Sequence, residues 1–430
     1  MTDHYGSMPS SASRKWALVL LAVAALPDVL PYPGMKALVS ERFGLGDAGT
    51  QLFAIAALFG AMLGVPLLRR VRRWSPARLF AIAALVQGCS IAPMALEISW
   101  PLMLLLRCIQ GFADLLLLVT LTTIVASDPG RIGRGFGLAG SGVMVGLGLG
   151  LALGGVIASS ALGLIFPVAA GIAFLLSICA WGLPRDPVRS IETNRTTERK
   201  DRKVILAGGF SASDRMVSGM LTISLPLLLV VNFDATPRVI GMILAGPLLA
   251  CAFGGYFSGW LVDRVGAIPV RMVAVPIQAV GVAVIVLSDG VPALLLLGSL
   301  GLSVGASALM PTSLVIGTGR SVGDVSLDAV GGIQALGQAG HLLGVVLILL
   351  TSLYFGAVTN WSVLGILALY CLWNAGMLGY HELNRSEAAV VPEGASARDR
   401  ATTAPGSSRR RRPIWGSEGR TASKSDSSVR

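Results

Sequence analysis

The stretch from Met103 to Leu118 places two opposite charges in an otherwise apolar run. Arg107, Gln110, Gly111 and Asp114 stand at i, i+3, i+4 and i+7, so they share one face of a helix. Arg107 and Asp114 are about 10 Å apart along such a helix, so each needs another partner. A carboxylate that meets an arginine in one conformation and loses it in another can release and take up a proton. The spacing therefore predicts acid–base chemistry inside a helix bundle.

Asp28 is the expected partner of Arg107. At a rise of 1.5 Å per residue, Asp28 lies about 19 Å along its helix, or about 11 Å from the far edge of a hydrocarbon layer. Arg107 lies about 10 Å from the same edge, so the equal depths predict an Asp28–Arg107 pair in at least one conformation. Because Pro27, Pro31 and Pro33 flank Asp28, we expect its helix to be kinked or broken.

Two further apolar runs carry polar side chains. Asp214 and Arg215 are adjacent, about 100° apart on a helix, and therefore cannot face each other. Gln334, Gln338 and His341 recur at i, i+4 and i+7, which favours hydrogen bonds between helices over a role in a cavity. The candidates for lining a cavity or binding a substrate are Gln110, Asp114, Asp214, Arg215, Gln334, Gln338 and His341.

The composition indicates lipid as the solvent around these groups. Of 430 residues, 53% are hydrophobic and only 13% are charged, whereas soluble domains carry about 25% charged residues. Runs of about 20 apolar residues can each cross a bilayer as a helix. The expected fold is therefore an all-α membrane protein with twelve transmembrane helices, at 16–35, 48–68, 77–96, 100–126, 135–157, 161–183, 204–232, 238–262, 267–288, 291–316, 327–352 and 357–379.

The positions of the 34 Lys and Arg residues predict the orientation. With the N-terminus inside, nearly all of them fall in the inside segments, and Arg271 is counted there at the start of the ninth span. Both termini are thus expected in the cytoplasm, with the chain in the cell (inner or plasma) membrane. The net charge of +11 is then a signal of orientation, and nucleic acid is not an expected partner.

The longest hydrophilic loop divides the spans into six and six. The predicted organisation is a cytoplasmic tail, a six-helix half, a central loop, a second half and a disordered basic tail, at 1–15, 16–183, 184–203, 204–383 and 384–430. The halves echo each other, because GVPLLRRVRR from Gly64 and GWLVDRVGAI from Gly259 follow corresponding spans.

These two loops resemble the signature G-x-x-x-D-R-x-G-R-R of the major facilitator superfamily. The copies keep Gly64, Arg69, Arg72 and Arg73 in the first half, and Gly259, Asp263, Arg264 and Gly266 in the second. The resemblance implies that the loops hold a cytoplasmic gate closed. An aspartate at a helix end can accept backbone N–H groups from a neighbouring helix start. We therefore expect Asp263, but not its counterpart Leu68, to bind the start of the fifth span near Gly135.

Arg107, Gln110 and Gly111 also resemble the family's R-x-x-Q-G motif. The fifth span resembles its pattern G-x8-G-x3-G-P-x-x-G-G, with Leu151 in place of the proline, and the glycines that match are Gly137, Gly146, Gly150, Gly154 and Gly155. In the family this pattern marks exporters that exchange substrate for protons. Apart from the family, a glycine at every fourth position gives a smooth ridge for close helix packing. We expect this ridge to help keep one gate closed.

Together these patterns predict a secondary active transporter, with Asp28 and Arg107 as the proton-coupling residues. The expected activity is proton-coupled efflux of a small amphipathic or lipophilic compound, driven by the proton gradient with no cofactor and no metal. The alternative is proton-coupled uptake of a small polar metabolite. The expected partners are the substrate, protons and the lipid bilayer, with the monomer as the functional unit. A polytopic membrane enzyme or scaffold is a remote alternative, because the sequence holds no catalytic cluster or phosphate-binding G-x-x-x-x-G-K-[ST] loop.

Overall fold

The computed structural model describes residues 9–71, 74–128, 131–185, 197–233, 235–288, 291–319, 325–355 and 360–390. The chain divides into two units, residues 1–379 and 380–430, and every contact discussed below lies within the first.

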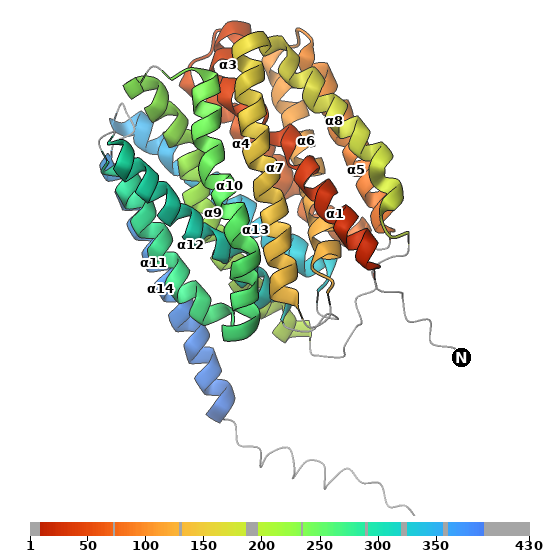
Figure 1. Ribbon diagram of the computed structural model, residues 1–430, viewed down its shortest axis with the longest axis vertical. Helices are drawn as coiled ribbons and strands as arrows, with labels where there is room; N and C mark the ends of the chain where they lie inside the picture. Colours follow the sequence, from red (N-terminus) through yellow and green to blue (C-terminus); the bar gives the residue numbers. More distant parts are fainter. Residues whose placement is uncertain are drawn as a thin grey trace, which may run out of the picture. The chain divides into compact units, whose positions relative to one another are not determined.

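Every element in the described ranges is a helix (Figure 1). A chain in lipid must satisfy its backbone hydrogen bonds internally, which an apolar helix does. The helices are α1 (Ser11–Ala24), α2 (Leu26–Val29), η1 (Tyr32–Gly34), α3 (Met35–Phe43), α4 (Asp47–Val71), α5 (Pro76–Ile91), η2 (Ala92–Ala95), α6 (Trp100–Val125), α7 (Ile132–Ala161), η3 (Leu162–Leu164), α8 (Ile165–Cys179), η4 (Ala180–Gly182), α9 (Thr197–Phe233), α10 (Pro237–Val265), α11 (Ala267–Val286), α12 (Pro292–Thr318), α13 (Leu327–Phe355) and α14 (Asn360–Val390).

The surface of this bundle suits lipid. Nine helical stretches in the described part of the chain are long and apolar enough to cross a membrane. One of them, Ile132–Gly182, is 51 residues long and holds both α7 and α8. Large apolar side chains point outward, among them Phe253 and Trp361, which are 87% and 82% exposed. A water-soluble monomer rarely exposes such side chains together. The twelve-span layout in two halves stays a prediction.

The first predicted span is broken at its prolines, as expected. It is divided into α1, α2, η1 and α3, and the breaks lie around Pro27, Pro31 and Pro33. Its predicted bounds, 16–35, are too narrow, because helical segments follow one another from Ser11 to Phe43 and fill most of the stretch before the second predicted span at 48–68. The helix α3 buries Leu38 and Val39 but holds Lys36, Glu41 and Arg42 within nine residues, so its apolar content is too low for a hydropathy window.

Two loop predictions are wrong at their edges for a related reason. Helix α9 begins at Thr197, inside the predicted loop 184–203, and α14 continues to Val390, past the predicted start of the disordered tail at 384. The extension of α9 is rich in Glu, Lys and Arg, and that of α14 holds Arg, Glu and two Ala, all of which favour helix without a long apolar run. Residues 186–196 and 391–430 lie outside the described residues, so the rest of both predictions is untested.

Helix α7 lies between α10 and the first span (Figure 1). Gly146, Gly150 and Gly154 face α1 and α2. A Cβ atom at Gly146 would overlap the carbonyl oxygen of Ala22, and one at Gly154 would overlap that of Leu30. The predicted ridge of close packing is therefore confirmed, with the first span as its partner.

A second glycine face of α7 packs against α10. A Cβ atom at Gly137 would overlap the carbonyl oxygen of Gly255, and one at Gly155 would lie 2.6 Å from that of Pro237. The motif's glycines thus serve two different neighbours. The sequence pattern alone did not predict which glycines contact the first span and which contact α10, because all of them lie on one glycine-rich helix.

Candidate functional site

The predicted pair between Asp28 on α2 and Arg107 on α6 is confirmed. Arg107 Nη2 lies 3.0 Å from Asp28 Oδ1 and donates a second hydrogen bond of 3.2 Å to the carbonyl oxygen of Asp28. Arg107 Nη1 donates to Gln110 Oε1 at 2.7 Å, so the two motif residues are joined as well. The Arg107 side chain is fully buried, whereas that of Asp28 is 23% exposed. Solvent can therefore reach the Asp28 carboxylate but not the Arg107 guanidinium.

Aromatic rings enclose the Arg107 guanidinium. Its Cζ atom lies 4.9 Å from the ring centroid of Phe53 and 5.7 Å from that of Tyr32. Such cation–π contacts stabilise a desolvated cation. Arg107 Nε and Gln110 Nε2 are buried without a partner in the described part of the chain. The site therefore holds a permanent positive charge with spare donors.

Asp114 is buried on α6 and, as predicted, does not pair with Arg107. Its Oδ1 accepts one long hydrogen bond of 3.4 Å from Gln87 Nε2 on α5. Among the described residues no cationic side chain lies within 4.0 Å of it. Arg107 and Arg215 act on it only over a longer range. Gln87 was not among the sequence candidates, although an amide in the middle of an apolar run is a usable signal.

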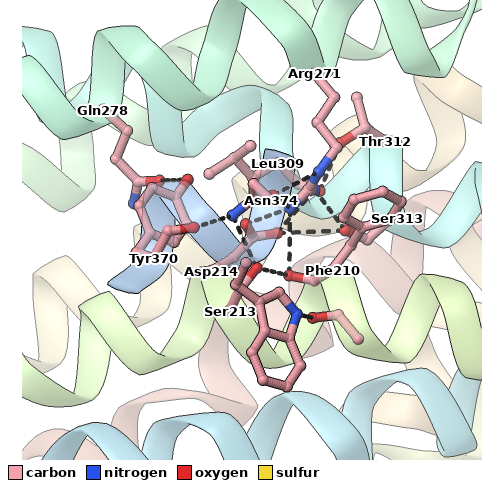
Figure 2. A network of polar contacts seen from close by, with 12 residues as sticks. Phe210, Ser213, Asp214, Arg271, Gln278, Leu309, Thr312, Ser313, Tyr370 and Asn374 are labelled. Carbon is pink, nitrogen blue, oxygen red and sulfur yellow. Dashed lines mark hydrogen bonds and ion pairs between the residues drawn. The ribbon is translucent and has the colours of Figure 1, made fainter. Parts of the chain in front are cut away.

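Asp214 on α9 forms an ion pair with Arg271, which was not among the candidate site residues predicted from the sequence (Figure 2). Arg271 Nη2 lies 2.6 Å from Asp214 Oδ1, and Nη1 donates to Oδ2 at 3.0 Å. This is the parallel, two-bond arrangement that an arginine fork favours. Arg271 was counted among the inside charges at the start of the ninth span, and that count is wrong, because Arg271 is fully buried inside α11.

Three more groups complete the cluster around Arg271 (Figure 2). Asn374 Oδ1 on α14 accepts from Nη2 at 2.7 Å, Ser313 on α12 accepts from Nη1 at 3.0 Å, and the Phe210 ring centroid is 4.2 Å from Cζ. Both oxygens of Asp214 are occupied, so this cluster ties α9, α11, α12 and α14 together. A buried ion pair of this kind persists only with such full hydrogen bonding.

Arg215 points to a different neighbour. Its Nη2 donates to Gln334 Oε1 on α13 at 2.5 Å, so the expected helix-to-helix hydrogen bond of Gln334 is confirmed. In the ranges that the structure describes, no carboxylate lies within 4.0 Å of Arg215, and its side chain is half-buried. Gln338 is buried on the same helix, and His341 Nε2 is buried without a partner among the described groups.

The expected contact between Asp263 and the fifth span is confirmed. Asp263 Oδ1 accepts from the backbone N of Gly133 at 2.7 Å, and Oδ2 accepts from that of Arg134 at 3.0 Å. The end of α10 is thereby held to the start of α7, where the N–H groups of a helix are free. A Cβ atom at Gly259 would overlap the carbonyl oxygen of Gly133, so the two helices need this glycine to approach.

The other loop residues have varied surroundings. Arg264 Cζ lies 4.6 Å from the ring centroid of Trp260. Gly266 has φ +107°, a conformation that favours glycine and ends α10. Gly64 packs against Phe112. Arg72, Arg73 and the side chain of Arg69 lie outside the described residues.

Ionisable side chains inside a multi-span bundle mark the path of a substrate or ion, so fold and site define a membrane transport protein. The sequence profile of the Major Facilitator Superfamily matches residues 17–212 and 204–422, and the chain belongs to this family. It is thus a multi-pass membrane protein and a secondary transporter of small molecules, not an enzyme. The resemblance stated from the motifs is confirmed.

Two solved structures show the same fold. The human organic anion transporter MFSD10 (TETRAN) is 17% identical, with 85% of this chain and 99% of that chain covered, at a TM-score of 0.67. The proton:xylose symporter XylE, bound to 6-bromo-6-deoxy-D-glucose, is 12% identical, with 86% and 95% covered, at a TM-score of 0.69. No curated protein matches this chain.

Proposed function

We propose that this chain is a proton-coupled exporter of a small amphipathic or lipophilic compound, working by alternating access as a monomer in the cell membrane. The observation that carries the proposal is the ion pair between Asp28 and Arg107 on a broken helix. Both termini are cytoplasmic in this proposal, and the proton gradient is the only energy source.

The pair gives Asp28 two states. In the proposed cycle Asp28 carries no proton while it is paired with Arg107 at 3.0 Å. When α2 moves away from α6 in this cycle, the Asp28 carboxylate loses its counter-charge and takes up a proton from the solvent that reaches it. The proline-broken first span supplies the freedom for that movement, and Arg107 stays charged in its aromatic surroundings.

The alternating movement requires a gate that opens. The hydrogen bonds from Gly133 and Arg134 to Asp263 join α7 to α10, which belong to opposite predicted halves. The second glycine face of α7 lets these helices meet closely near both ends of α7. Breaking the Asp263 contact and rocking the halves about this seam would expose the charged cavity to the cytoplasm.

Proton-coupled uptake of a polar metabolite is the second candidate. XylE, which has the same fold, is a proton:xylose symporter, so this architecture can couple protons to transport in the same direction. The absence of the motif proline at Leu151 also weakens the likeness of α7 to exporters.

Transport in sided vesicles tests the proposal. Inverted vesicles holding a pH gradient are screened with amphipathic compounds, and export predicts collapse of the gradient when a substrate is added. Asp28→Asn should abolish this collapse while substrate still binds. Asp128→Asn is the matched control, because Asp128 pairs with Arg14 at 2.5 Å, away from this site.

Full proton-driven transport by Asp28→Asn would refute the role of Asp28. Collapse only in right-side-out vesicles would replace export by uptake.

A further inference from the structure

The charges in the membrane-spanning helices are not equally compensated. Asp28 with Arg107, and Asp214 with Arg271, form ion pairs of 3.0 and 2.6 Å. Asp114 and Arg215 have no opposite charge within 4.0 Å in the part of the chain that the structure describes. Each is held instead by one neutral amide, Gln87 for Asp114 and Gln334 for Arg215. A buried charge without a counter-charge is costly, so both groups have unused capacity to bind one.

These two charges belong to one region. Asp114 lies on α6 and Arg215 on α9, and α13 packs against both helices. Gln334, which holds Arg215, is on α13. No hydrogen bond or ion pair joins the two charges in the described part of the chain. In the predicted layout Asp114 and Arg215 come from opposite halves, and both of their helices border α13.

We propose that Asp114 and Arg215 form a binding subsite for a small zwitterion with an apolar body. This inference rests on the proposed transport function and names its substrate class. The carboxylate of the zwitterion binds Arg215, and its ammonium group binds Asp114. The proposal makes Gln87 and Gln334 positioning residues that orient the two charges.

Each end of the subsite has the donors or acceptors that this ligand needs. Gln334 fixes one Nη atom of Arg215, which leaves the other N–H groups for a carboxylate. Gly337 allows Arg215 this position, because a Cβ atom there would lie 2.8 Å from Arg215 Cδ. Gln87 Oε1 is fully buried without a partner among the described groups, so it can accept from an ammonium beside Asp114.

A ligand with only one charge fits this subsite less well. A simple acid would leave Asp114 uncompensated beside a second anion, and a simple amine would leave Arg215 uncompensated. Leaving one member of an enclosed charge pair unpaired weakens binding by about 30-fold or more. The zwitterion should therefore bind at least that much more tightly than the matched amine or acid.

Counterflow exchange in proteoliposomes tests the subsite without any proton gradient. Labelled L-leucine, L-phenylalanine and L-tryptophan are offered as zwitterions with apolar bodies. Each is competed by its decarboxylated amine (3-methylbutylamine, phenethylamine, tryptamine) or its deaminated acid (4-methylpentanoate, 3-phenylpropionate, indole-3-propionate). We expect exchange of at least one zwitterion, with the matched amine and acid inhibiting about 30-fold more weakly.

Charge-removing variants assign the two ends. Arg215→Gln should weaken zwitterion binding to the level of the amine, and Asp114→Asn to the level of the acid. Arg238→Gln and Glu97→Gln remove exposed charges of the same kind and should bind as the wild type does. Arg215→Lys keeps the positive charge but loses the two-pronged guanidinium, so we expect zwitterion binding between that of the wild type and that of Arg215→Gln. This variant replaces Arg215→Gln in the test if Arg215→Gln does not fold.

The outcomes separate this inference from the proposed function. Zwitterion exchange, combined with no collapse of the pH gradient when that zwitterion is added to inverted or right-side-out vesicles, would refute proton coupling and support the subsite. Three results would overturn the subsite. The first is that the amine or the acid inhibits as strongly as the zwitterion, and the second is that none of the three zwitterions exchanges. The third is that Arg215→Gln and Asp114→Asn both exchange as the wild type does.

Discussion

Replacing Asp263 by alanine should release the start of α7 from the end of α10. The variant loses two hydrogen bonds, of 2.7 and 3.0 Å, from backbone N–H groups to a carboxylate. Hydrogen bonds to charged groups contribute about 1.5–3 kcal/mol when enclosed, but Asp263 is half-buried, so we take about 1 kcal/mol for each. The total of about 2 kcal/mol shifts the ratio of joined to separated conformers by about 30-fold.

The distance between the two helix ends reports this ratio. Arg131 at the start of α7 and Val265 at the end of α10 are exposed, so spin labels can be placed on Arg131→Cys and Val265→Cys in a background without the native cysteines. Electron paramagnetic resonance then gives the populations of short and long distances. Asp263→Ala should move the population to the long distance, and Asp263→Asn, which keeps one acceptor oxygen, should shift it by about 5-fold.

The control is Asp128→Ala, which removes a carboxylate that binds Arg14 rather than α10. It should leave the distance distribution unchanged. If Asp263→Ala also leaves the distribution unchanged, the contact does not hold the helices together and the gating argument for Asp263 fails.

The remaining predictions concern the packing of α7 and the cluster around Arg271. Gly150→Leu should cause a proton leak and loss of export, because a Cβ atom there lies only 2.5 Å from Val29 Cγ2. Gly171→Leu is the control, because a Cβ atom there meets nothing within 4 Å. Vesicles of Gly150→Leu that hold a pH gradient and export normally would contradict this role of the ridge. Arg271→Met should lower the free energy of unfolding by about 3–5 kcal/mol, since Asp214 is left unpaired. Adding Asp214→Leu should recover most of that loss in thermal unfolding, and no recovery would show that the pair is not the cause.

Hydropathy predicted most of the helices because lipid imposes a simple rule. A backbone in hydrocarbon must bond within its own helix, so apolar runs such as 100–126 and 327–352 correspond closely to α6 and α13. The rule says nothing about helix outside the hydrocarbon. The helix at Thr197 and the one ending at Val390 were therefore missed at their charged ends, where propensity and not hydropathy decides.

A contact in the site could be predicted from the sequence where the depth of both residues in the membrane is enough to pair them. Asp28 and Arg107 could be matched by counting residues from each end of the membrane. Asp214 could not be matched to Arg271, because the facing side of each helix depends on packing between helices. Arg271 also lies only five residues into α11, where it reads as a loop arginine.

In both ion pairs the acid leaves the ribosome before its arginine. Asp28 is made 79 residues before Arg107, so α6 enters the membrane with its partner already present. Asp214 is made 57 residues before Arg271 and 160 residues before Asn374, so α9 must wait for α11 and α14. An unpaired acid at the centre of a bilayer costs about 2.5–3.5 kcal/mol during insertion. The helix that carries the acid therefore lacks its partner until a later helix is made, and the hydrogen bonds around Arg271 are complete only when α14 has been synthesised.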